Sequence, residues 1–400
     1  MDSSLQAQVD AQMLEQGAFT ALELLFNSGR LLYSDYESWR RREIEFLDGV
    51  LMGNPDKIKA EIEQAVSYAR RIKLVEQPQE FHAWHTAEGA ASSDRPLRIS
   101  MDAQLQRLIG SRFVRAQSVP QMDLFFDNPV VALTNGIVQA LGTRNLPAAQ
   151  QKLDQLYAQA PTHADLPAFD QLLVALRHLG HPVEEPRDEL TFLMEISPTA
   201  RRLLGTQYRD LLSPLWTQLA QTLTDVPFDP SEPNLHASFA LAQAQDWAGV
   251  SECVQFEPDW PQHAALCLRL VESGLHQRQR VAALAAWCHL CWRAPETASQ
   301  AVTQLRQPEL TTLWQHFQDD EDSDLTESDF PAVLLLREPG LALQLPEDLP
   351  TSDTPSEHHY RTIHQWIHAR RERQHDVELA LRKTLQAEHP GLFELLKSSV

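Results

Sequence analysis

Residues 129–161 read PVVALTNGIVQALGTRNLPAAQQKLDQLYAQAP, and this stretch decides the fold class that the sequence predicts. Apolar residues recur at helical spacing from Pro129 to Leu141, and the run Gly-Thr-Arg-Asn that follows is typical of a turn. A second helical series then runs to Pro161, with its apolar face at Ala149, Leu153 and Leu156. The stretch therefore predicts two helices joined by a tight turn, a helical hairpin.

The small residues and the closing proline of this hairpin resemble a degenerate tetratricopeptide repeat. Gly136 lies in the first helix, Ala149 in the second, and Pro161 ends the unit. A fainter unit covers residues 235–258, with matching residues at Ala240, Ala244, Trp247, Cys253 and Pro258. The resemblance implies an all-α chain built as an array of helical hairpins, an α-solenoid.

Breaks in the helical pattern predict three regions. The first, residues 1–126, contains three helices before residue 74 and a mobile loop at 75–99. A helix from Ser100 to Phe113 and an extended run complete it. The second region, residues 127–318, is the helical array.

The third region, residues 330–400, follows an acidic loop at 319–329. It is predicted to contain one long helix from Ser356 to Glu388 and a last turn that begins at Pro390. The short apolar runs within residues 331–346 fit either a β-hairpin or short helices.

The composition describes an ordered, acidic chain of 400 residues. Hydrophobic residues make up 43%, and the formal net charge is −21, which disfavours direct contact with nucleic acid or anionic membranes. The N-terminus does not resemble a secretory signal, and no apolar run reaches the length of a membrane span. These features predict a cytoplasmic protein.

A pentapeptide between two predicted helices, Gln121-Met122-Asp123-Leu124-Phe125, is the sharpest motif in the chain. It resembles the peptide by which many bacterial proteins dock on the DNA polymerase sliding clamp, Gln-Leu-Ser/Asp-Leu-Phe. The resemblance implies that Leu124 and Phe125 anchor in an apolar pocket while Gln121 orients the peptide and Met122 adds a secondary contact. The alternative interpretation is that Leu124, Phe125 and Phe126 plug a crevice between helices.

Four cysteines offer a second candidate site. Cys288 and Cys291 have the spacing of half a zinc site or of a redox pair, and Cys253 and Cys267 are the other two. Since the pair lies within a strongly apolar helical segment, we predict buried free thiols and no metal.

Histidines offer a third candidate. His364, His368 and His375 recur on one face of the predicted final helix, with Glu357 seven residues before the first. Gln365 stands where a metalloprotease helix carries its glutamate, so we predict a polar helix flank. His82 and His85 form an equally weak ligand pair.

The chain carries no recognisable nucleophile motif, phosphate loop or paired metal carboxylates. We therefore predict a non-enzymatic adaptor without cofactors that docks on the sliding clamp and binds another protein or peptide on its array. The alternative is a chaperone or assembly scaffold unrelated to DNA, which a groove lined by Trp216, Trp247, Trp287 and Trp292 would favour. The basic runs at residues 40–42 and 370–373 are predicted to be exposed and salt-bridged.

Overall fold

The computed structural model describes residues 3–84, 96–115, 129–277, 279–305, 308–318, 325–349, 351–352 and 354–398. Contacts divide the chain into two compact units. Unit 1 comprises Met1–Val226 and Asn234–Asp246, and unit 2 comprises Pro227–Pro233 and Trp247–Val400. This division differs from the three regions suggested by the sequence, which remain a prediction.

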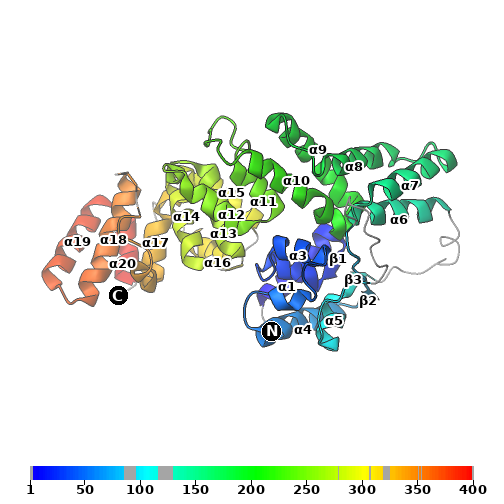
Figure 1. Cartoon of the computed structure of the whole chain (residues 1–400). Helices are drawn as coiled ribbons and strands as arrows, with labels where there is room; N and C mark the ends of the chain where they lie inside the picture. The colour runs from blue at the N-terminus through cyan, green and yellow to red at the C-terminus, as the bar shows by residue number, and fades with distance from the viewer. Residues whose placement is uncertain are drawn as a thin grey trace. The chain divides into compact units, whose positions relative to one another are not determined.

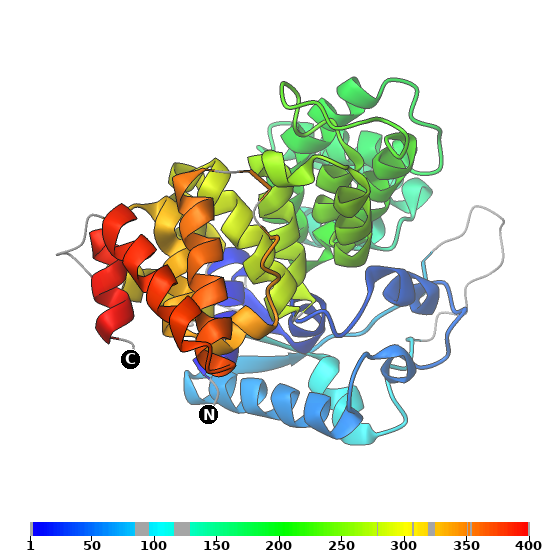
Figure 2. The same ribbon diagram turned by 90° about the vertical axis from the view of Figure 1, so that its left-hand side faces the viewer.

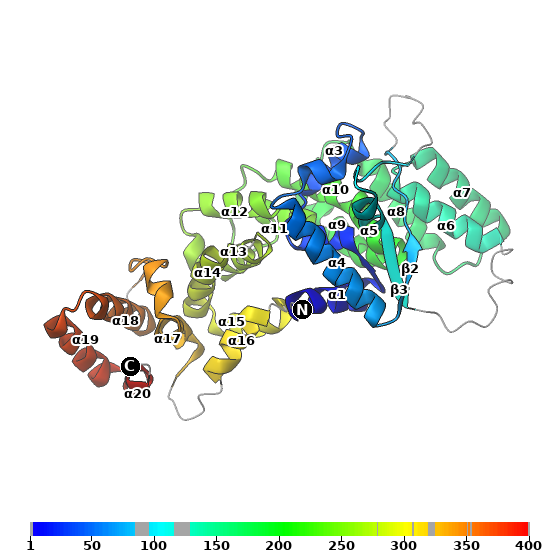
Figure 3. The same cartoon turned by 90° about the horizontal axis from the view of Figure 1, so that it is seen from below.

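Unit 1 begins with a part that combines helices and a small sheet. The sheet is antiparallel, with strand order β1-β3-β2, and Figure 3 shows β2 and β3 beside α4 and α5. The elements are α1 (Ser3–Gln16), β1 (Ala18–Thr20), α2 (Ala21–Asn27), α3 (Tyr33–Arg40), the 3-10 helix η1 (Leu47–Val50), α4 (Pro55–Arg71), β2 (Leu74–Pro78), α5 (Ala103–Ile109) and β3 (Ser111–Arg115).

The strands correct the expectation of an all-α chain. Gly17, with a φ of 67°, ends α1 and lets the chain enter β1. The helix predicted from Ser100 to Phe113 is present but shorter, because Asp102 caps a helix that ends at Ile109 and the chain then forms the central strand. Phe113 pairs with Phe19 on one side and with Glu76 on the other. The sequence signal was weak because each strand is five residues or shorter.

One aromatic core holds this part together. Trp39 is fully buried, and its Nε1 donates to the carbonyl of Arg98 at 2.8 Å. Phe19 and Phe113 meet across the sheet with ring centroids 5.8 Å apart, and the apolar face of α4 packs into the same cluster. This core fixes α2 and α3, the two helices that carry residues of the site described below.

Helices form the rest of unit 1 (Figure 1). The predicted hairpin is confirmed, since two helices pack together across a turn in which the Asn145 side chain accepts from the N–H of Ala148 at 3.1 Å. Successive helices contact each other, and α10 also contacts α6 and α8, so a solenoid remains a prediction. The elements are α6 (Pro129–Gly142), α7 (Leu146–Gln159), α8 (Leu166–His178), α9 (Pro186–Leu204), η2 (Gly205–Gln207), α10 (Tyr208–Thr222) and α11 (Ala237–Ala244).

Every described element of unit 2 is helical. Trp287 and Phe330 pack with Trp314 in its core, at centroid distances of 5.8 and 4.9 Å from that ring. Figure 2 shows the C-terminal helices, orange to red, packed side by side. The elements are α12 (Trp247–Phe256), η3 (Trp260–Gln262), α13 (Ala264–His276), α14 (Arg280–Arg293), α15 (Pro295–Leu305), α16 (Pro308–Gln318), η4 (Glu327–Asp329), α17 (Phe330–Arg337), η5 (Pro339–Leu343), α18 (Pro355–Arg371), α19 (His375–Glu388) and α20 (Pro390–Ser398).

The C-terminal elements of unit 2 differ in part from those predicted from the sequence. Residues 331–346 form helices, α17 and η5, and not a β-hairpin. The predicted long final helix is interrupted, because Arg373 adopts a φ of 61° between α18 and α19. The last turn does begin at Pro390, as α20. No helix in the described part of the chain is long and apolar enough to cross a membrane.

Candidate functional site

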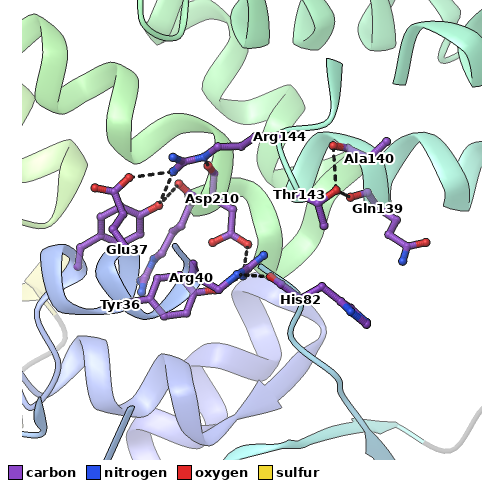
Figure 4. Close-up of polar contacts among 11 residues, drawn as sticks. Tyr36, Glu37, Arg40, His82, Gln139, Ala140, Thr143, Arg144 and Asp210 are labelled. Carbon is purple, nitrogen blue, oxygen red and sulfur yellow. Dashed lines mark hydrogen bonds and ion pairs between the residues drawn. The ribbon is translucent and has the colours of Figure 1, made fainter. Parts of the chain in front are cut away.

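A buried cluster of charged side chains lies in unit 1, where α3 meets the start of α10 (Figure 4). Arg40, in the last turn of α3, places its Nη1 3.1 Å from Oδ2 of Asp210, and it also donates to the hydroxyl of Tyr36. Its Nε donates to the carbonyl of His82 at 2.9 Å. The side chains of Arg40 and Asp210 are only 5% and 8% exposed, so this ion pair is almost completely removed from water.

The residue next to Asp210 forms a second buried pair. Arg209 Nη2 lies 2.5 Å from Oε1 of Glu23, and both side chains are 5% exposed. The Arg209 guanidinium lies 4.9 Å from the ring centroid of Phe26, on the same helix as Glu23. Two consecutive residues at the start of α10 therefore tie that helix to both α2 and α3.

Arg144, in the turn of the hairpin, connects the cluster to α6 and α7. Its Nε donates to the carbonyl of Asp210 at 2.8 Å. Pro214, four residues further along α10, has no N–H and cannot supply the helical hydrogen bond to that carbonyl. Arg144 Nη2 also donates to Glu37 at 3.1 Å and to the hydroxyl of Tyr33 at 3.3 Å. The arginine thus compensates for a proline inside a helix.

The electrostatics favour a structural network over catalysis. Three arginines face three carboxylates, so the formal charges of Arg40, Arg144, Arg209, Glu23, Glu37 and Asp210 sum to zero. Burial raises the pKa of Asp210 despite the opposing charges of Arg40 and Arg144. Burial likewise raises the pKa values of Tyr33 and Tyr36, so both phenols stay neutral. No side chain in this cluster is prepared as a nucleophile beside a general base.

Two hollows flank the cluster. The first has a volume of about 530 Å³, and most of the residues that line it are polar or charged. It lies against Arg40, Arg209 and Asp210 and reaches Asn135 and Gln139 of α6 and Thr143, the residue after that helix. The Thr143 hydroxyl does not donate into the hollow, because it donates to the carbonyls of Gln139 and Ala140 (Figure 4).

The second hollow is larger, about 950 Å³, and we call it the Trp84 groove. Its charged rim holds three arginines and one glutamate, Arg41, Arg144, Arg177 and Glu37. The Arg144 guanidinium lies 3.4 Å from the ring centroid of Trp84 and the Arg40 guanidinium lies 5.0 Å from it, which fixes the indole. The apolar lining is Trp84, Leu146, Pro147, Leu176, Leu179 and Pro214.

The clamp-like peptide is outside the described residues. Gln121, Met122, Leu124 and Phe125 fall between the end of β3 at Arg115 and the start of α6 at Pro129, both in unit 1. His85 is also outside the described residues, and His82 contributes its carbonyl to Arg40.

Three of the four cysteines are core residues, whereas Cys253 is half-buried. Cys288 and Cys291 are fully buried, and burial raises the pKa of each thiol. Burial also raises the pKa of Cys267 to about 12. Within the described part of the chain none of the four joins a group of three potential metal ligands.

The histidines flagged from the sequence make structural contacts. Nε2 of His364 and of His368 each lies 3.0 Å from a carbonyl oxygen, of Leu345 and Ala342 respectively. The side chain of His375 is 85% exposed and belongs to the next helix. A shared metal-binding face on one long helix is therefore ruled out for these three.

The four tryptophans that would favour a scaffold function pack within their own units. Trp216, Trp287 and Trp292 are buried, and Trp247 stacks on His276 with ring centroids 4.1 Å apart. Trp84 borders the second hollow, although its side chain is also buried, at 4% exposed.

The prediction that the first basic run is exposed and salt-bridged is confirmed for Arg41 but is wrong for Arg40. Arg40 is buried, whereas Arg41 is exposed and lies 3.5 Å from Glu37 on the same helix. A usable signal existed, because Tyr33, Tyr36 and Arg40 recur at the spacing of one helix face.

In comparisons with known proteins, no protein-family model, curated protein or solved structure matches this chain.

Proposed function

We propose that this chain is a non-enzymatic adaptor for protein–protein interactions, and the Trp84 groove is the observation that carries the proposal. The groove is apolar along its lining and carries a formal charge of about +2 from its arginines and glutamate. The whole chain, by contrast, has a formal net charge of −21. A local excess of arginine beside an apolar surface favours a partner segment that combines acidic and apolar residues.

The groove is suited to such a segment because its parts are held in place before binding. Arg144 is locked by Glu37, Tyr33 and the Asp210 carbonyl, and it stacks on Trp84. On the rim, Arg177 donates to the exposed side chain of Gln150 and forms no ion pair with the described residues. A peptide would bury its apolar residues on the groove lining and place its carboxylates beside Arg41 and Arg177.

Replacing Arg177 by glutamate should weaken binding of an acidic peptide at least tenfold, because it lowers the formal charge of the groove by two units, from about +2 to about 0. The probe is a fluorescent peptide of alternating glutamate and leucine, and the readout is anisotropy at two salt concentrations. Arg202→Glu is the matched control, since Arg202 is exposed on α9 and pairs with Asp165 away from the groove. Equal affinity for a lysine–leucine peptide, or no effect of Arg177→Glu, would contradict the proposed occupant.

We further propose that Gln121, Met122, Leu124 and Phe125 dock this adaptor on the bacterial DNA sliding clamp, which would link it to replication or repair in the cytoplasm. The support is the match of the pentapeptide to the clamp-docking pattern. A peptide of this size buries little area, so micromolar affinity is expected. Leu124 and Phe125 would supply most of the binding free energy.

Replacing Gln121, Leu124 and Phe125 together by alanine should abolish clamp binding, because both anchors and the orienting amide are lost. The measurement is calorimetry of the purified full chain with a bacterial sliding clamp, with circular dichroism to verify folding. Asp123→Ala is the matched control within the same peptide and should bind normally, because Asp123 is proposed to face solvent. Undiminished binding by the triple variant would exclude this peptide as the anchor.

The alternative is a cytoplasmic helical scaffold, chaperone or assembly factor unrelated to DNA. The Trp84 groove favours it equally, because acidic peptides occur in many partners. Peptide binding in the groove together with no clamp binding would select this alternative.

A further inference from the structure

We infer that unit 2 contains a binding site for one divalent transition-metal ion, formed by Asp329, His359 and His389. One potential ligand atom from each residue lies within 4.8 Å of the others. The three residues come from three separate places in the chain: the end of η4, the first half of α18, and the junction of α19 and α20. This inference is independent of the proposed adaptor function.

The carboxylate of Asp329 is held in a fixed orientation. Its Oδ2 accepts from the N–H and the hydroxyl of Thr326 at 3.0 and 2.9 Å, and its Oδ1 accepts from the hydroxyl of Ser356 at 3.2 Å. The side chain is 5% exposed. A carboxylate positioned by three donors in this way still offers the other lone pair of Oδ1 to a cation.

The two histidines point at this carboxylate without forming proper hydrogen bonds. His359 Nδ1 lies 3.8 Å from Oδ1 of Asp329, and His389 Nε2 lies 3.5 Å from Oδ2. Both distances exceed the 2.7–3.2 Å range of N–H···O bonds. His359 Nδ1 has no hydrogen-bond partner although its side chain is only 8% exposed. A buried, unpartnered nitrogen aimed at a carboxylate is the second observation that indicates a ligand here.

The separations suit a metal ion better than a hydrogen bond. Zinc binds imidazole nitrogen and carboxylate oxygen at about 2.0–2.2 Å, which places two ligands of a tetrahedron roughly 3.4 Å apart. His359 Nδ1 lies 3.8 Å from Oδ1 of Asp329, close to that value, and one ligand atom from each of the three residues lies within 4.8 Å of the others. Two histidines and one carboxylate form a ligand set that zinc and ferrous iron both accept, with a remaining position for water.

Ion binding would change one backbone contact. His389 Nδ1 now lies 3.3 Å from the N–H of Leu392, in the first turn of α20. Coordination through Nε2 places the ring proton on Nδ1, so this long contact is lost when the metal binds. In exchange the metal would connect the N-terminus of α17 with α18 and with the α19–α20 junction.

The decisive experiment is a titration of the EDTA-treated full chain with Zn²⁺ by calorimetry and with Co²⁺ by visible absorption. We expect one equivalent of either ion per chain, and Co²⁺ d–d bands of a low-coordinate site. His389→Gln should weaken the affinity at least tenfold while the far-ultraviolet circular dichroism stays unchanged. His358→Gln is the matched control, because His358 is adjacent to the site residue His359 but is 52% exposed and lies 3.4 Å from Glu388.

Failure of the unaltered chain to bind a stoichiometric ion would overturn the inference, whatever the variants do. Binding that His389→Gln leaves unchanged, or that His358→Gln weakens equally, would also overturn it by placing the ion elsewhere. Asp329→Asn provides a second variant, since it preserves the size of the side chain and should likewise weaken Co²⁺ binding at least tenfold.

Discussion

Replacing Arg40 by methionine should lower the free energy of unfolding of unit 1 by about 3–5 kcal/mol, because it leaves a buried carboxylate without its cation. The Asp210 side chain is 8% exposed and would keep its place in α10. The variant also loses the hydrogen bonds from Arg40 to Tyr36 and to the carbonyl of His82. Urea unfolding measures the loss, and hydrogen exchange assigns it to α3 and α10, since a chain of two units need not unfold in one step.

Two further variants isolate the charge effect. The double variant Arg40→Met/Asp210→Leu removes both charges and should recover most of the loss, because an apolar pair of similar volume replaces a buried ion pair well. Arg41→Met is the neighbouring control; its side chain is 45% exposed, so its effect should stay within about 0.5 kcal/mol. A loss below 1 kcal/mol in Arg40→Met would show that the pair contributes little.

The loss of stability in Arg40→Met should depend on pH. Burial raises the pKa of Asp210 in the folded chain, and removal of Arg40 raises it further. A carboxyl whose folded pKa exceeds its unfolded value favours folding when protonated, and this contribution is lost as the pH rises through the folded pKa. The deficit of Arg40→Met should therefore be smaller at pH 5 than at pH 8.

Helix positions were predictable where the chain carries its own start and stop signals. Pro129 opens α6, Asn145 caps α7 and Pro390 opens α20, each as the sequence indicates. The interruption at Arg373 was not predictable, since the residues between α18 and α19 include neither glycine nor proline. The three short strands were not predicted, because their pairing joins residues as distant in the sequence as Phe19 and Phe113.

The sites were less predictable than the fold, for a physical reason. Arg40, Arg144 and Asp210 are far apart in the chain, and only tertiary packing brings them together. The same holds for Asp329, His359 and His389, whereas the closely spaced His364 and His368 proved to bind backbone carbonyls. Local spacing identifies a helix face, but it does not reveal what that face contacts.

Replacing Glu357, in the first turn of α18, should cause the second large loss of stability. Its side chain is completely buried, and Oε1 lies 2.8 Å from Nη2 of Arg293. Oε2 accepts from the N–H and the hydroxyl of Thr354 at 3.2 and 2.8 Å and from the hydroxyl of Ser352. Glu357→Gln should cost about 2–3 kcal/mol at pH 7, because hydrogen bonds to a charged group are replaced by weaker ones and Arg293 loses its counter-charge.

The pH dependence of this cost follows from the pKa of Glu357. Burial alone would raise that pKa, but the bonds from Ser352 and Thr354 and the charge of Arg293 outweigh burial and lower it. A carboxyl with a lowered folded pKa stabilises the fold above its unfolded pKa, about 4.3 for glutamate, and the contribution disappears as the pH falls through the folded value. Thermal unfolding should therefore show the unaltered chain and Glu357→Gln converging below about pH 4. The control is Glu388→Gln, since Glu388 is 44% exposed beside His358, and its unfolding temperature should follow that of the unaltered chain at every pH. A difference in unfolding temperature between Glu357→Gln and the unaltered chain that stays constant down to pH 2 would contradict the assignment.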